Sequence, residues 1–268
     1  MSENIKPQKN LQQVFISILV IAAIGLAFFS GTLWQKVKNL EKGGGTTTAQ
    51  PTANAQPAVS LNTIKGLFDK DLVKFGDKDR KVIFVEISDP SCPYCQVAAG
   101  LNPTLNRQVD STNNRFKLVS DGGTYLAPVP EMKKLLDSGK ASFVWIYSPG
   151  HGNGEMGTKA LYCANEKGKF WEVNDLLMTN KGYDLLNNTI KNDKAKSGEL
   201  ATFLKTAVDS TFLKECLDSG KYDARLSSDT QIASSLGFQG TPHFFVNDKA
   251  FPGAYSYTDM KSVVDAAL

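Results

Sequence analysis

Apolar residues are spread unevenly along the chain, and their longest run lies near the N-terminus. Residues 14–34 are mostly Val, Ile, Leu, Ala and Phe, and no charged side chain occurs from Asn10 to Gln35. About 20 apolar residues are enough to cross the hydrocarbon core of a bilayer, so this run predicts a transmembrane anchor behind a short N-terminal segment, residues 1–13. A cleaved signal peptide is the alternative, but its apolar region is typically only about 7–15 residues long.

Small and polar residues follow the predicted anchor. Residues 35–58 contain Gly43, Gly44 and Gly45 and then a stretch rich in Thr, Ala, Gln and Pro. Such a composition has little to bury and predicts a flexible stalk. Lysines flank the apolar run on both sides, so the excess of positive charge that normally marks the cytoplasmic side does not orient the anchor.

The remaining chain, residues 59–268, has the pattern of one globular domain. Short β-branched and aromatic runs predict buried strands at residues 82–85 and 143–147, each ended by a turn signal. A last β-hairpin is predicted around Asn247-Asp248.

Helical spacing dominates the part between the second strand and the hairpin. From about residue 155 to 237 the chain predicts a helical insert, which includes an amphipathic helix over residues 200–208. Residues 256–259 resemble a capping box at the start of a closing helix. The order of these elements predicts an α/β fold interrupted by a helical subdomain.

Composition narrows the class of protein. The 268 residues are 41% hydrophobic and 21% charged, with a formal net charge of +3. This charge is too small and too scattered to predict a nucleic-acid partner. Four cysteines are too few for a disulfide scaffold, and two of them, Cys92 and Cys95, stand at a C-x-x-C spacing, which indicates a redox or metal function.

The C-x-x-C motif lies between the first predicted strand and a predicted helix. A cysteine at a helix N-terminus is stabilised as a thiolate by the helix dipole and by free backbone N–H groups. Cys92 has this position, and Pro93 follows at the first helical residue, where a missing N–H is harmless. Cys95 comes one turn later and is expected to be shielded and able to form a disulfide with Cys92. Cys92 is therefore the predicted nucleophile and Cys95 the resolving thiol, with Tyr94 between them.

Glu86 lies within the first predicted strand, six residues before Cys92. Its orientation is open, because strand alternation can place it on either face. Facing inward, the carboxylate would be desolvated, with a raised pKa and a role in moving the proton of Cys95. Facing outward, it would be an ordinary solvated side chain.

A metal site is the rival interpretation, because C-x-x-C is also half of a zinc site. The other potential ligands are Cys163, Cys216, His151 and His243, and no two of them stand at ligand spacing. We therefore expect no metal and no other cofactor.

Four motifs follow one another along the domain: residues 85–89 (VEISD), 92–95 (CPYC), 168–171 (GKFW) and 236–242 (LGFQGTP). In this order they resemble the DsbA-like branch of the thioredoxin superfamily, and the resemblance extends over residues 59–268. It implies a thioredoxin-like fold with an inserted helical subdomain, and thiol:disulfide oxidoreductase activity.

The resemblance also implies roles for residues outside the C-x-x-C motif. Pro242 is expected to follow a cis peptide bond and to face the two cysteines, with the backbone of Thr241 presented to an extended peptide. Cys163 and Cys216 are expected to form a second disulfide, with two free buried thiols as the alternative. Residues 101–140 exceed the family pattern and are expected to be an added surface element.

The function that follows is that of a single-pass protein of the cell membrane, with its catalytic domain outside the cytoplasm, that introduces disulfides into exported proteins. Tyr94 and Thr241 resemble isomerase-type members of the branch, so a disulfide isomerase or reductase is the alternative, and a metal-binding module is a more distant one. The expected partners are reduced exported proteins and membrane lipid around the N-terminal helix. The resemblance adds a quinone-linked membrane oxidase that re-oxidises the protein.

Overall fold

The computed structural model describes residues 59–268. The chain divides into two units, Met1–Ala55 and Gln56–Leu268. The predicted N-terminal segment, anchor and stalk lie outside the described residues. Within residues 59–268, no helix is both long enough and apolar enough to cross a bilayer.

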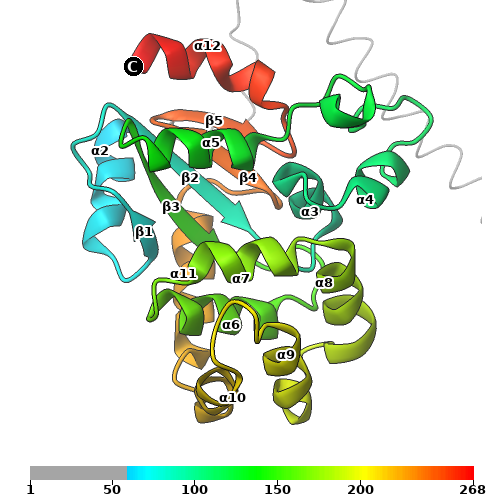
Figure 1. Cartoon of the computed structure of the whole chain (residues 1–268). Helices are drawn as coiled ribbons and strands as arrows, with labels where there is room; N and C mark the ends of the chain where they lie inside the picture. Colours follow the sequence, from blue (N-terminus) through cyan, green and yellow to red (C-terminus); the bar gives the residue numbers. More distant parts are fainter. Residues whose placement is uncertain (1–58) are drawn as a thin grey trace, which may run out of the picture. The chain divides into compact units, whose positions relative to one another are not determined.

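A five-stranded mixed sheet forms the centre of the described domain (Figure 1). The strand order is β1-β3-β2-β4-β5; β2 and β3 run parallel, and the other neighbouring pairs are antiparallel. Every residue of β2 and β3 is buried, which explains why both strands are nearly continuous apolar runs. They contain the strands predicted at 82–85 and 143–147. The bounds are β1 Val73–Phe75, β2 Val82–Ser88, β3 Ala141–Tyr147, β4 His243–Val246 and β5 Lys249–Pro252.

Side chains alternate between the two faces of the sheet and build a separate apolar cluster on each. On β2, Val82 and Phe84 belong to the larger cluster, whereas Ile83, Val85 and Ile87 belong to the smaller one. Helices α3, α5, α6, α7 and α12 contribute to the larger cluster, and α2 and α11 contribute to the smaller. Their bounds are α2 Leu61–Lys65, α3 Pro93–Ala99, α5 Pro128–Asp137, α6 Glu155–Asn165, α7 Phe170–Leu177, α11 Asp223–Ser235 and α12 Tyr257–Ala267.

The helical insertion lies between β3 and β4, where the sequence predicts it at about residues 155–237. It runs from α6 to α11 and contains a π-helical segment, η3 (Figure 1). The helix predicted over 200–208 is shorter than expected and ends at Phe203. The chain then turns before the next helix, α10. Asp209 is the N-cap of α10 and accepts a hydrogen bond from the N–H of Phe212 at 2.8 Å. The remaining bounds are α8 Asn180–Asp184, η3 Leu185–Ile190, η4 Lys194–Lys196, α9 Ser197–Phe203 and α10 Ser210–Ser219.

Residues 101–140 are more than the added surface element that the sequence predicts. Val129 and Met132 on α5 are buried in the larger apolar cluster, so this part of the segment belongs to the core. The expectation is wrong for α5 because the burial of a helix face depends on packing against distant elements, and Pro128 and Pro130 lie in the first turn, where a helix tolerates proline. The segment also contains α4 Pro103–Gln108 and the 3-10 turn η2 Val119–Asp121, and a similar turn, η1 Gly66–Asp69, follows α2.

The turns at the end of the chain follow the sequence pattern. Asn247 adopts a left-handed φ of 55° in the hairpin between β4 and β5, a conformation that asparagine tolerates. Ser256 and Asp259 form the predicted capping box at the start of α12.

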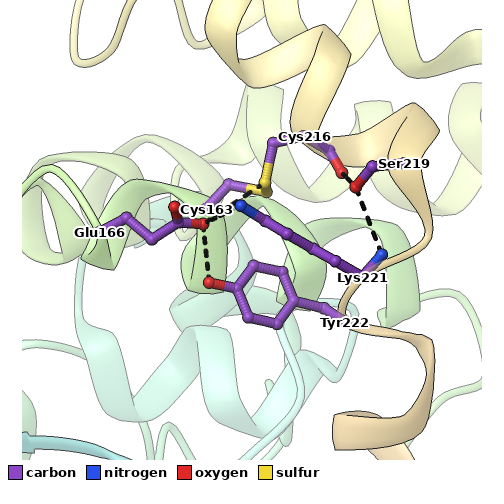
Figure 2. Close-up of a disulfide and its surroundings, with 6 residues drawn as sticks. All are labelled: Cys163, Glu166, Cys216, Ser219, Lys221 and Tyr222. Carbon is purple, nitrogen blue, oxygen red and sulfur yellow. Dashed lines mark hydrogen bonds and ion pairs between the residues drawn. A yellow bond between two sulfur atoms is a disulfide. The ribbon is translucent and has the colours of Figure 1, made fainter.

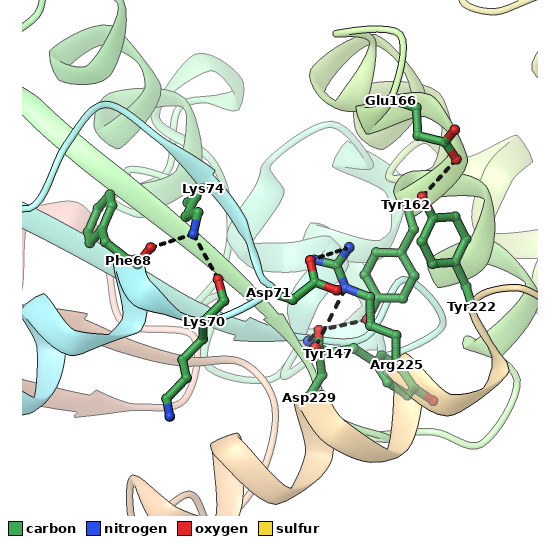
Figure 3. Close-up of polar contacts among 10 residues, drawn as sticks. All are labelled: Phe68, Lys70, Asp71, Lys74, Tyr147, Tyr162, Glu166, Tyr222, Arg225 and Asp229. Carbon is green, nitrogen blue, oxygen red and sulfur yellow. Dashed lines mark hydrogen bonds and ion pairs between the residues drawn. The ribbon is translucent and has the colours of Figure 1, made fainter.

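Asp229 on α11 ties the insertion to β3 from inside the fold (Figure 3). Its Oδ2 accepts hydrogen bonds from the phenol of Tyr162 at 2.6 Å and from the N–H of Tyr147 at 3.2 Å. The guanidinium of Arg225 stacks 4.2 Å from the centroid of the Tyr162 ring, while its Nε lies 3.9 Å from Asp229 Oδ1, too far for a hydrogen bond. Burial raises the pKa of Asp229 to about 6, because these contacts only partly replace water.

Cys163 on α6 and Cys216 on α10 form a disulfide, with their Cα atoms 6.1 Å apart (Figure 2). The structure thus contains the pairing that the family resemblance implies. The carboxylate of Glu166 lies beside the bridge and accepts hydrogen bonds from the Tyr222 phenol at 2.7 Å and from Lys221 Nζ at 2.6 Å. The disulfide therefore joins two helices of the insertion under a cover of charged and aromatic side chains.

We expect the Cys163–Cys216 disulfide to stabilise the domain by about 4 kcal/mol, because it closes a long loop in the unfolded chain, with a sequence separation of 53. Replacing both cysteines with alanine should lower the free energy of unfolding in urea by about this amount. The protein with the Cys163–Cys216 disulfide and the variant without it should both also carry C92A and C95A, so that only this disulfide differs between them. Equal free energies of unfolding would contradict the prediction.

Candidate active site

The C-x-x-C motif lies where β2 passes into α3. After β2 ends at Ser88, the chain turns, and the N–H of Cys92 donates to the carbonyl oxygen of Asp89 at 3.0 Å. Cys92 occupies the N-cap position of α3, with no hydrogen bond from its side chain to the helix, and Pro93 is the first residue of that helix. Cys92 is 4% exposed and Cys95 is 0% exposed, and both are free thiols.

The two thiols differ in acidity. The pKa of Cys92 is lowered to about 7, chiefly by a hydrogen bond with Cys95; burial opposes this shift, and contacts with Thr241 and with the N–H of Tyr94 add to it. Burial raises the pKa of Cys95, and the neighbouring Cys92 sulfur raises it further. At neutral pH a large fraction of Cys92 is therefore thiolate, whereas Cys95 keeps its proton.

The loop before β4 faces Cys92. The Thr241–Pro242 peptide bond is cis, and the Sγ–H of Cys92 donates to the carbonyl oxygen of Thr241 at 3.5 Å. These two residues are 149 positions apart in the chain, so the fold alone brings them together. The residues predicted to support the site, Thr241 and Pro242, are therefore beside the predicted nucleophile.

A third loop, between β3 and α6, packs against both of these segments. A Cβ atom added at Gly150 would lie 1.8 Å from Thr241 Oγ1 and 3.2 Å from the Cβ of Cys92. Only a residue without a side chain fits between the cysteine and the loop before β4. The sequence pattern predicts merely a strand end at this glycine, because no local signal reveals its distant neighbours.

Asp89 holds the motif and the third loop together. It is fully buried, and its Oδ1 accepts hydrogen bonds from the N–H and the hydroxyl of Ser91, each at 2.7 Å. Its Oδ2 accepts from the N–H of Gly150 at 2.7 Å and from the N–H of His151 at 3.0 Å. In the sequence Asp89 reads only as part of a turn, because Gly150 is 61 positions away along the chain.

Two amide side chains fix the motif against the helical insertion. Gln96 is fully buried, and its Nε2 donates to the carbonyl oxygens of Pro90 and Leu177, each at 3.0 Å. Asn187, in η3, donates from Nδ2 to the carbonyl oxygen of Ser91 at 3.1 Å. The turn that precedes Cys92 is therefore held from both sides.

Glu86 points into the protein and is 3% exposed. On β2 it lies between Trp145 of β3 and Phe244 of β4, on the same face as Phe84. Burial raises the pKa of Glu86 to about 7, and the nearby Ser88 side chain only partly opposes this shift. Of the two orientations that the sequence leaves open, the inward one is found, and its carboxyl group can hold a proton near neutral pH.

An open pocket of about 430 Å³ lies beside the motif. Tyr94 and Thr241 line it together with Arg115 and Phe116, which belong to the segment before α5. The Tyr94 side chain is 45% exposed, and its ring stands edge-on to that of Phe116 with centroids 5.8 Å apart. Sequence reasoning missed Arg115 and Phe116, because no spacing signal links them to the C-x-x-C motif.

Potential metal ligands do not gather around the motif. In the described part of the chain, the one group of three His, Cys, Asp or Glu side chains with ligand atoms close together is Cys163, Glu166 and Cys216. Two of these ligand atoms are the sulfurs of the disulfide, which are bonded to each other. Among residues 59–268, the C-x-x-C pair therefore has no further protein ligands of the kind that a structural zinc site needs.

Comparison with known proteins gives a family match over half of the chain. Residues 129–266 match the family model described as Thioredoxin. The Na(+)/H(+) antiporter NhaA 3 of Salinispora tropica is 25% identical over 205 residues, which are 75% of this chain but 25% of the antiporter. The chain thus spans about a quarter of the length of that relative. Disulfide bond formation protein D of Bacillus subtilis is 22% identical over 237 residues, 85% of this chain and 84% of the relative.

Solved structures share the architecture. The crystal structure of Chlamydia trachomatis DsbA is similar with a TM-score of 0.54 and 16% sequence identity, covering 74% of this chain and 91% of the other. At this level of identity the likeness concerns the fold. It confirms the predicted thioredoxin-like α/β fold with a helical insertion.

The acidity of Cys92 can be measured directly. Because only the thiolate reacts, alkylation of Cys92 by iodoacetamide in the reduced protein should follow a titration with its midpoint near pH 7. Cys95 should remain unmodified over the same range, since its pKa is raised. Mass spectrometry of the peptide that contains both cysteines, after timed quenching at each pH, measures the two rates. A midpoint near pH 9, the ordinary thiol value, would contradict the prediction.

Glu86→Gln should change how stability depends on pH. The carboxyl group ionises near pH 4.5 in the unfolded chain and near pH 7 in the folded protein. The protonated group favours the folded state, so its contribution to the free energy of unfolding is fully present below pH 4.5 and is lost as the pH rises through 7. Relative to wild type, the glutamine variant should therefore gain about 3 kcal/mol in free energy of unfolding above pH 7, and nothing below pH 4.5.

Urea unfolding of the oxidised proteins across this pH range tests the effect. Glu215→Gln, on the exposed side of α10, is the matched control and should show no such change. If the free energies of unfolding of wild type and Glu86→Gln differ by the same amount at all pH values, the raised pKa of Glu86 is wrong.

Proposed function

The chain belongs to the thioredoxin family, and from this membership we propose that it is a thiol:disulfide oxidoreductase that introduces disulfides into exported proteins through Cys92 and Cys95. The observation that carries the proposal is the difference between the two thiols. Cys92 begins a helix and has a pKa of about 7, while burial raises the pKa of Cys95. A nucleophile that ionises readily, next to a shielded thiol that does not, suits ordered disulfide exchange.

The reaction starts from the Cys92–Cys95 disulfide. A client thiolate attacks Sγ of Cys92, the bond between the two protein sulfurs breaks, and Cys95 leaves as a thiolate that takes up a proton. A second client thiolate then attacks the client sulfur of the mixed disulfide, and Cys92 leaves as a thiolate. The client ends with one new disulfide, and its two electrons reside on the reduced pair of the protein.

Neighbouring residues have supporting roles in this cycle. The backbone of Thr241, held beside Cys92 by the turn at Pro242, presents hydrogen-bonding groups to an extended client segment. Glu86 holds a proton near neutral pH and supplies it to Cys95 when that thiolate is released. Pro93 starts the helix without leaving an unpaired N–H at the site.

The acidity of Cys92 also favours oxidation of clients over their reduction. Stabilising the Cys92 thiolate stabilises the reduced pair, which makes the disulfide form more oxidising and Cys92 a good leaving group. Tyr94 and Thr241 resemble isomerase-type members of the branch, so an isomerase or reductase of the same fold is the second candidate.

The proposed location is the outer side of a cell membrane. Residues 14–34 are long and apolar enough for a single span, and the Cys163–Cys216 disulfide suits an oxidising compartment. The Bacillus subtilis relative is called Disulfide bond formation protein D, which supports a role in forming disulfides. The reduced Cys92–Cys95 pair then passes its two electrons to a membrane oxidase linked to a quinone.

The full-length protein in its disulfide form should oxidise a reduced, unfolded client with several thiols in stoichiometric amounts. Given the same client in its disulfide form, the Cys95→Ala variant should accumulate mixed disulfides: the Cys92 thiolate attacks the client disulfide, one client sulfur leaves as a thiolate, and no resolving thiol releases the client. The Cys92→Ala variant should trap none. Non-reducing electrophoresis and mass spectrometry of the trapped species measure both outcomes.

Equal trapping by the two variants would overturn the assigned order of the thiols. The reduction potential of the Cys92–Cys95 pair tests the direction of electron flow. A value near that of thioredoxin, about −270 mV, together with efficient reduction of client disulfides, would favour the reductase instead.

A further inference from the structure

The pocket beside Cys92 contains one formal charge. Arg115 is part of its lining, and no acidic residue is. The guanidinium of Arg115 stacks on Phe116, with Cζ 5.0 Å from the ring centroid. Arg115 forms no salt bridge with any residue that the structure describes, so its positive charge is available to a ligand.

Asp259 is the acidic group that shares surroundings with Arg115. Both line a neighbouring pocket of about 310 Å³, but Asp259 is not within salt-bridge distance of Arg115 among the described contacts. Its Oδ2 accepts a hydrogen bond from the N–H of Ser256 at 3.1 Å in the capping box of α12. The charge of Arg115 is therefore not neutralised by a close internal partner.

The position of Arg115 suits a side chain close to the reacting client cysteine. Tyr94 follows Cys92 by two residues, and its ring centroid is 5.8 Å from that of Phe116. The Cζ atom of Arg115 is 5.0 Å from the same Phe116 centroid, so the guanidinium lies within about 11 Å of the Tyr94 ring. An extended chain advances about 3.3 Å per residue, so about three client residues cover this span.

Building on the proposed function, we propose that Arg115 is a specificity determinant that favours clients with an acidic side chain within about three residues of the reactive cysteine. The carboxylate pairs with the guanidinium, which can donate a hydrogen bond to each of the two carboxylate oxygens, and the rings of Tyr94 and Phe116 cover the aliphatic part of the client side chain. Thr241 aligns the client backbone between Cys92 and this subsite. The substrate class is thus narrowed to acidic cysteine-containing segments.

The test uses three dithiol peptides that differ only in one residue, Glu, Gln or Lys, placed near the reactive cysteine. The oxidised full-length protein should oxidise the Glu peptide about threefold to fivefold faster than the Gln peptide at low ionic strength. The ratio should fall towards one in about 0.5 M salt, because the pocket is open and salt screens the pair. In Arg115→Gln the ratio of the two oxidation rates should be about one, and in Arg115→Glu the Lys peptide should be oxidised fastest.

Arg107→Gln is the matched control. It removes the same charge from α4, in the same segment, but Arg107 does not line the pocket and pairs with Asp121 at the surface. In this variant, the ratio of the oxidation rates of the Glu peptide and the Gln peptide should equal the wild-type ratio. Oxidation of all peptides at equal rates, or a ratio retained by Arg115→Gln, would overturn this inference alone. Failure to oxidise any peptide would instead overturn the proposed function.

Discussion

A buried carboxylate after the central strand is the contact on which the arrangement of the site depends. Asp89 follows a strand whose side chains are all buried, and it accepts four hydrogen bonds from backbone and hydroxyl donors. Two donors belong to Ser91, in the turn before Cys92, and two belong to the loop that contacts Thr241 through Gly150. Desolvating a carboxylate is costly unless such donors replace water, so the two loops hold their positions together.

Three carboxyl groups are buried in the described domain, those of Glu86, Asp89 and Asp229. They differ in how many hydrogen-bond donors replace the water that each loses on burial. Asp89 has four donors, and Asp229 has two and a loose contact with Arg225. For Glu86, the nearby Ser88 side chain is the one group that favours the charged form. Burial raises the pKa of Asp229 to about 6 and that of Glu86 to about 7, because the neighbouring groups replace only part of the lost hydration. The least compensated group lies on the strand that leads to the two thiols, where a proton is needed at neutral pH.

The groups that set the acidity of Cys92 differ from most of the residues that line the neighbouring pocket. The start of α3 and its neighbours set the acidity of Cys92, through a hydrogen bond with Cys95 and backbone donors. The surrounding pocket takes its shape and charge from other parts of the chain, including Arg115 and Thr241. Under the proposed role of Arg115, a change in the segment before α5 alters which clients are favoured without altering the exchange reaction. The disulfide of the insertion joins α6 and α10, two helices that do not contribute to the pocket lining.

The sequence by itself determined the features that depend on short-range pattern. It determined the two central strands, the helical insertion, and the position of Cys92 and Pro93 at a helix start, because periodicity and capping chemistry are local. The tertiary structure decided the inward orientation of Glu86, since strand alternation allows either face. It also decided that Asp89 joins two loops and that Arg115 lines the pocket. Those contacts link residues far apart in the chain, up to 149 positions in this site, and packing brings them together without leaving a local signal.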